Sequence, residues 1–143
     1  MQMEGNNVLI TLKGTQMSDE HGLVEVITAG KCIRQGDKYC ITYEESELTG
    51  MKGTTTTLTV DGKRVTLIRS GAANSQFIFE KGARHVCFYE TPYGAFSIGV
   101  RTGAINVDIG DREGHISAEY LLDIDNSSIS VNNFDMKIKQ FAG

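Results

Sequence analysis

The chain has 143 residues, with 14 lysines and arginines against 18 aspartates and glutamates. A net charge of −4, mixed in sign along the chain, argues against nucleic-acid binding, which calls for a basic surface. No apolar run approaches the ~20 residues of a membrane-spanning helix. A chain of this length buries about two-thirds of its surface around one core, so we expect a single domain over residues 1–143.

The composition favours strands. The sequence holds 13 Thr, 13 Ile and 9 Val but only 8 Leu and 8 Ala, and β-branched side chains pack well on a pleated surface. It also holds 16 Gly and a single Pro, which indicates many tight turns without low complexity. We therefore expect an all-β protein.

Apolar and polar residues alternate with a period of two in segments along the chain, and this period is typical of strands. The segments are 8–12, 39–45, 65–69, 96–100, 105–109 and, longest, 116–124. In the last part of the chain the parity changes between Val131 and Phe134, which predicts a β-bulge at Asn132-Asn133. Residues 15–21 are too short and too polar to assign, and no convincing helix is present.

Turn signals separate these segments. Asp61-Gly62 predicts a type I′ hairpin turn, since both residues accept positive φ angles. Pro92 suits a rigid corner. Further turns are expected at 36–37, 80–82, 102–103, 110–114 and 126–127.

Short connections favour antiparallel neighbours. A long antiparallel meander leaves exposed edges unless it closes, so we expect an up-and-down barrel of roughly 8–10 strands. A two-sheet sandwich is the alternative, but its crossovers need longer connections. Residues 46–53 form the longest hairpin-type connection and are a candidate cover for one barrel mouth.

Two alternating faces end in a charge. Tyr43 shares a face with Glu45, and Leu67 shares one with Arg69. A charge buried alone is costly, so Glu45 and Arg69 could pair and form a polar anchor for a ligand in the lumen. The simpler interpretation, which we favour, is that each strand has reached the rim and its last residue is solvated.

A second polar pattern lies in the threonine run 54–57. Thr55, Thr57 and Thr59 share one face, and we interpret them as exposed strand formers in preference to a hydroxyl-lined wall.

Motifs for catalysis, nucleotides and metals are missing, so no catalytic residue, cofactor or metal is expected.

Cys32 and Cys40 flank the 36–37 turn, where a three-residue loop would place them opposite each other and a two-residue loop would not. Three cysteines without framework spacing, and no signal-peptide pattern at the start of the sequence, indicate free thiols in the cytoplasm. We interpret all three as small buried hydrophobic residues.

Several short motifs occur in a characteristic order. They are Tyr43-Glu44-Glu45-Ser46, residues 53–57, Arg69-Ser70-Gly71, residues 79–82 and Tyr89-Glu90-Thr91-Pro92-Tyr93-Gly94, with Tyr120 further on. The ordered set resembles the YwiB-like family of uncharacterised bacterial proteins over nearly the whole chain. The resemblance implies a calycin-type, lipocalin-like β-barrel and carries over no catalytic residue. By analogy of fold, the resemblance also implies a small apolar or amphipathic ligand.

Three hypotheses follow. The first is a barrel that binds a small ligand in or at its lumen, with candidate residues Tyr43, Glu45, Arg69, Phe77, Tyr89 and Tyr93. The second is an enzyme that uses Glu45 as acid or base and Arg69 as electrostatic stabiliser in the same cavity. The third is a protein-interaction module or homodimer whose barrel is filled by its own side chains. No membrane or nucleic-acid partner is expected.

Overall fold

The computed structural model describes residues 3–14, 24–45, 53–71, 74–91, 94–110, 112–124 and 127–140. Within these ranges the chain forms ten strands and no helix, so no helix there could cross a membrane. The all-β prediction is therefore confirmed. The strands are β1 (Met3–Gly14), β2 (Val24–Gln35), β3 (Lys38–Glu44), β4 (Thr54–Asp61), β5 (Arg64–Gly71), β6 (Ser75–Glu80), β7 (Arg84–Thr91), β8 (Gly94–Ile109), β9 (Glu113–Ile124) and β10 (Ser127–Gln140).

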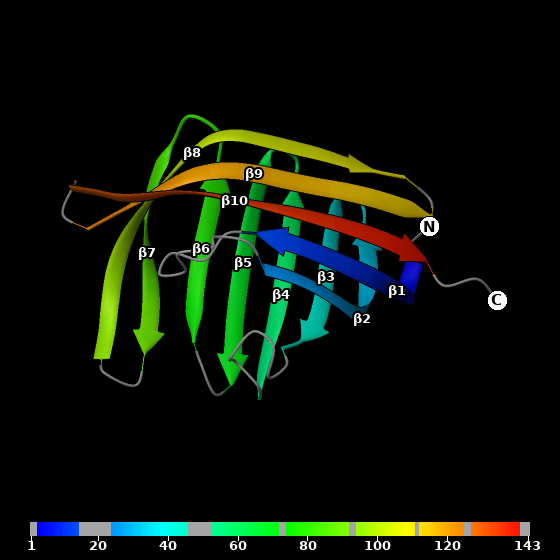
Figure 1. Ribbon diagram of the computed structural model, residues 1–143. Helices are drawn as coiled ribbons and strands as arrows, with labels where there is room; N and C mark the ends of the chain where they lie inside the picture. The colour runs from blue at the N-terminus through cyan, green and yellow to red at the C-terminus, as the bar shows by residue number, and fades with distance from the viewer. Residues whose placement is uncertain are drawn as a thin grey trace.

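The strands close into one antiparallel up-and-down barrel. Each strand pairs with its neighbours in sequence, and β1 pairs with β10 to close the sheet. The barrel prediction is confirmed and the sandwich alternative is wrong. Figure 1 shows that β8, β9, β10 and β1 run across the front and cross the more upright β3 to β7 behind them.

The barrel has two ends. The turns after β2, β4, β6 and β8 gather at one end, together with the last residue of β10. We call this the even-turn end. The strands β3, β5 and β7 end at the other, which we call the odd-turn end.

Two hairpin turns show how glycine sets the register. Gln35 pairs with Lys38 across Gly36-Asp37, as predicted. Asp61 pairs with Arg64, so the second turn is Gly62-Lys63, one residue later than predicted. In both turns the first loop residue is a glycine with a φ of 62°. The later register places Val60 opposite Val65, and both side chains are buried.

Two irregularities differ from the sequence prediction. Residues 102–103 are not a turn, because β8 continues through them with a register shift between Thr102 and Ala104. Before the shift the even-numbered residues of β8 face the lumen, and after it the odd-numbered residues do. In β10 the shift lies between Ser128 and Ser130, not at Asn132-Asn133.

The reason for the second difference is a polar residue on the inner face. Asn132 is buried and donates a hydrogen bond from Nδ2 to Ser130 Oγ at 2.7 Å, whereas Val131 is 75% exposed. The apolar pattern alone could not show that an asparagine faces inward and a valine outward.

Aliphatic side chains fill the middle of the lumen. The largest fully buried ones come from strands all round the barrel and include Ile10, Ile41, Leu58, Val65, Val100, Ile116 and Met136. Phe79 of β6 meets Tyr120 of β9 and Phe134 of β10, with ring centroids 4.8 Å and 5.4 Å away. Each large side chain buried here stabilises the fold by about 1.5–3 kcal/mol. The filled middle leaves the two ends as the places where a ligand could enter.

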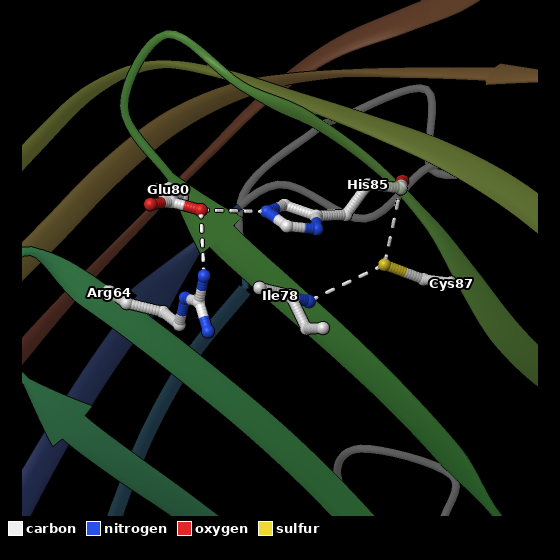
Figure 2. A network of polar contacts seen from close by, with 5 residues as sticks. All are labelled: Arg64, Ile78, Glu80, His85 and Cys87. Carbon is white, nitrogen blue, oxygen red and sulfur yellow. Dashed lines mark hydrogen bonds and ion pairs between the residues drawn. The ribbon is translucent and has the colours of Figure 1, made fainter.

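A polar network ties β5, β6 and β7 together. The β6–β7 ladder has only two described residue pairs, and Figure 2 shows what joins the two strands beyond them. The Cys87 Sγ accepts the Ile78 N–H at 3.4 Å and donates to the His85 carbonyl oxygen at 3.7 Å. Glu80 binds His85 at 2.9 Å and Arg64 at 3.1 Å. These contacts give the network a structural role.

The three cysteines are free thiols. Cys32 pairs with Ile41 and Cys40 with Ile33. The two-residue loop therefore places the two cysteines at positions that are not opposite each other. Cys87 is buried as predicted, but Cys32 and Cys40 are only half-buried.

Candidate ligand-binding site in the barrel lumen

Three adjacent strands bring the predicted polar residues together at the odd-turn end. Thr56 of β4 lies opposite Tyr43 of β3 on one side and Arg69 of β5 on the other. Glu45 follows β3, and its N–H donates to the Thr54 carbonyl at 2.8 Å, which extends the ladder by one residue. Because inward positions alternate, Tyr43, Glu45, Thr56 and Arg69 share the inner face. We call these four residues the Glu45 cluster.

The cluster contains a largely buried ion pair. Arg69 Nε lies 3.6 Å from Glu45 Oε2, and their side chains are 20% and 1% exposed. The interpretation that Glu45 is a solvated rim residue is therefore wrong. The carboxylate can be buried because it faces Arg69 and accepts a hydrogen bond from the Thr56 hydroxyl, and such partners offset the cost of desolvation.

Tyr43 is the fourth member of the cluster. Burial raises the pKa of its hydroxyl, and the negative charge of Glu45 and a hydrogen bond to that carboxylate raise it further. The phenol therefore keeps its proton and serves as a donor to Glu45 at neutral pH. Two donors and one cation converge on this carboxylate, which fixes its orientation.

The sequence interpretation missed the inward threonines. Thr54 and Thr56 are fully buried on the inner face, at the same parity as Leu58 and Val60. That parity was the available signal. Thr55, Thr57 and Thr59 lie on the other face and are half-exposed, which agrees with their assignment as strand formers.

Apolar side chains continue the inner wall beside the cluster. Phe77 lies opposite Leu67, and its ring centroid is 6.4 Å from that of Phe79. Leu12, Leu67, Phe77, Tyr120 and Phe134 pack against the core but are only partly buried. Inner-face residues that keep part of their surface exposed provide apolar contact area for a ligand.

Arg69 acts on this wall as well as on Glu45. Burial raises the pKa of Tyr120, and the positive charge of Arg69 opposes that rise. The Arg69 guanidinium is therefore electrostatically coupled to a hydroxyl on β9, across the lumen from β5.

The structure places four of the six predicted site residues on the inner face: Tyr43, Glu45, Arg69 and Phe77. The backbone of Tyr89 pairs with Ser75 and Phe96, but its side chain is outside the part that the structure describes. Tyr93 also lies outside the described residues.

One atom of the cluster lacks a partner. Arg69 Nε is buried and makes no hydrogen bond within the described ranges, since Glu45 is beyond hydrogen-bond distance. A buried donor without an acceptor is costly. A carboxylate, phosphate or carbonyl oxygen could satisfy it.

The model of the family described as "Domain of unknown function (DUF1934)" matches residues 10–138, and the chain belongs to this family. A similar relative is the uncharacterised beta-barrel protein YwiB of Bacillus subtilis. It is 27% identical over 128 residues, which cover 87% of this chain and 88% of the relative. The crystal structure of the ywiB protein from Bacillus subtilis is similar with a TM-score of 0.84 at 19% identity, over 99% of this chain and 96% of that chain. The resemblance found in the sequence is thus confirmed, and the structural match supports the same fold.

Proposed function

We propose that this protein binds a small amphipathic ligand at the odd-turn end of its lumen, with an anionic or carbonyl group of the ligand at Arg69. The observation that supports this most is the Nε atom of Arg69, a buried donor with no hydrogen-bond acceptor among the described residues. It stands beside partly exposed apolar side chains of the inner wall.

Each part of the site has a role in this proposal. Glu45 holds the guanidinium in place from one side, and Tyr43 and Thr56 hold Glu45. An oxygen of the ligand would accept from Arg69 Nε, and a charged acceptor makes the stronger bond. Leu67, Phe77 and Tyr120 would pack against the apolar part of the ligand, which favours an amphipathic molecule over a purely polar one.

Because its three thiols are free, we further propose that the protein acts in the cytoplasm.

The test is mass spectrometry under native and then denaturing conditions, after incubation with a whole-cell organic extract. We expect a stoichiometric added mass that leaves on denaturation. Arg69→Ala should lose this mass, and Arg69→Lys should keep less than a tenth of the occupancy because lysine cannot place a donor at Nε. The matched control is Arg64→Ala, since Arg64 lies on the same strand but is exposed and bonds Glu80.

A bare protein mass after this incubation would contradict the proposal, and so would an added mass that Arg69→Ala leaves unchanged. Far-UV circular dichroism of each variant separates loss of binding from loss of fold. A dimer mass in the same spectrum would support the interaction-module hypothesis.

A further inference from the structure

A concave site lies at the end of the barrel opposite to the Glu45 cluster. A cleft of about 70 Å³ opens at the even-turn end, where β8 ends, β9 begins and β10 ends, at the right in Figure 1. Its floor is apolar, formed by Val8, Cys32, Ile109 and Ile138. It includes no residue of the Glu45 cluster.

Two arginines stand at the rim of this cleft. Arg34 donates from Nε to the Gly36 carbonyl oxygen at 3.1 Å, and its guanidinium lies over the Tyr39 ring, 5.5 Å from the centroid. Both contacts fix the direction of the guanidinium and leave its terminal nitrogens for other acceptors.

Arg112 is anchored through its backbone. Its carbonyl oxygen accepts the Gln140 N–H at 2.7 Å, which holds the turn after β8 against the end of β10. Among the described residues that line the cleft, Glu113 is the one acidic residue. The described lining thus holds two guanidinium groups, of Arg34 and Arg112, against one carboxylate, in a chain whose net charge is −4.

We propose that this cleft is a second binding site, for a short aliphatic carboxylate. Charge complementarity with Arg34 and Arg112 selects an anion, and the planar guanidinium fork matches a carboxylate. The apolar floor selects an aliphatic chain. The volume of the cleft limits the length of that aliphatic chain. A cavity of about 150 Å³ holds a benzene ring, and this cleft has about half that volume.

The test is a titration of the ¹⁵N-labelled protein with sodium butyrate at constant ionic strength, followed by amide chemical shifts. We expect saturable shifts at Gly110, Arg112, Gly114 and Gln140, and no such shifts with n-butylamine hydrochloride, which has the same chain and the opposite charge. Arg34→Ala and Arg112→Ala should each weaken binding about ten-fold, since charge-assisted hydrogen bonds are among the stronger ones. Arg64→Ala should leave it unchanged, because Arg64 does not line the cleft and binds Glu80.

A second measurement uses the cysteines of one hairpin. Cys32 lines the cleft, whereas Cys40 does not, and both are half-buried. Butyrate should slow maleimide labelling of Cys32 and leave that of Cys40 unchanged. Shifts that scatter over the protein, fail to saturate or appear equally with butylamine would overturn the proposal. A butyrate affinity that depends on Arg69 and not on Arg34 would also overturn it, and would assign the anion to the odd-turn end.

Discussion

Thr56 and Thr102 show how one residue type has two different energetic roles on the same inner face. Both side chains are fully buried. The Thr56 hydroxyl donates to Glu45, whereas Thr102 Oγ1 has no hydrogen-bond partner within the described residues. A buried hydroxyl without a hydrogen-bond partner destabilises the fold, whereas one that donates to a buried carboxylate stabilises it.

We therefore predict opposite effects of the same substitution in the ligand-free protein. Thr56→Val should lower the free energy of unfolding by about 1–2 kcal/mol, because it removes a donor to a buried charge. Thr102→Val should leave it unchanged or raise it by up to ~1 kcal/mol. Urea denaturation of both variants measures the difference, and equal losses would show that the hydroxyl of Thr102 has a partner after all.

At the scale of the element, the path of β2 depends on one residue without a side chain. Gly30 lies between Val8 of β1 and Tyr43 of β3. A Cβ atom there would be 2.5 Å from the Thr42 carbonyl oxygen and 2.6 Å from Ile10 Cδ1. The first of these atoms is backbone, so relief requires a shift of the strand. Gly30 thus lets β2 approach the strand that carries Tyr43 into the Glu45 cluster.

Gly30→Ala should destabilise the protein by about 1–3 kcal/mol, which is the usual cost of overpacking a core. The matched control is Gly103→Ala, because a Cβ at the β8 bulge would meet nothing within 4 Å. We expect that control to change the free energy of unfolding by no more than ~0.5 kcal/mol. Thermal unfolding of the two variants side by side provides the comparison, and a Gly30→Ala protein as stable as the control would contradict the packing argument.

At the scale of the whole molecule, closure of the sheet decides how stability responds to pH. Closure places two tyrosines, Tyr43 and Tyr120, on the inner face, and burial raises the pKa of each. On the outer network, the partners His85 and Arg64 lower the pKa of Glu80. The raised pKa of the two tyrosines changes the stability of the fold at alkaline pH, and the lowered pKa of Glu80 changes it at acid pH.

The alkaline response can be predicted with its sign. In the unfolded chain a tyrosine loses its proton near pH 10, while folded Tyr43 still holds it, so the native state binds more protons. The stability from Tyr43 is thus present below pH 10 and is lost as pH rises above it. The free energy of unfolding should fall by about 1 kcal/mol per pH unit more steeply in the wild type than in Tyr43→Phe. Urea denaturation at pH 8, 10 and 11 checks this, and parallel curves would contradict it.

Local patterns in the sequence were enough to predict the class of fold. Alternation over residues such as 116–124 and glycines at 36 and 62 specified strands and hairpins, because side-chain parity and positive φ are local properties. These patterns also pointed to Tyr43, Glu45 and Arg69, because a charge at the end of an apolar face is visible in one strand. The sequence also contains the signal that Thr56 faces inward while Thr55 and Thr57 face outward, because Thr56 has the same parity as the apolar Leu58.

The positions that departed from these local patterns depend on contacts between strands, which the sequence does not show. Whether Glu45 is solvated or buried depends on Arg69 and Thr56, which come from other strands. Whether residues 102–103 turn or bulge depends on how β8 pairs with β9. The cleft between Arg34 and Arg112 joins the second strand to the turn after the eighth. Such contacts exist only once the barrel closes, because closure brings together residues that are distant along the chain.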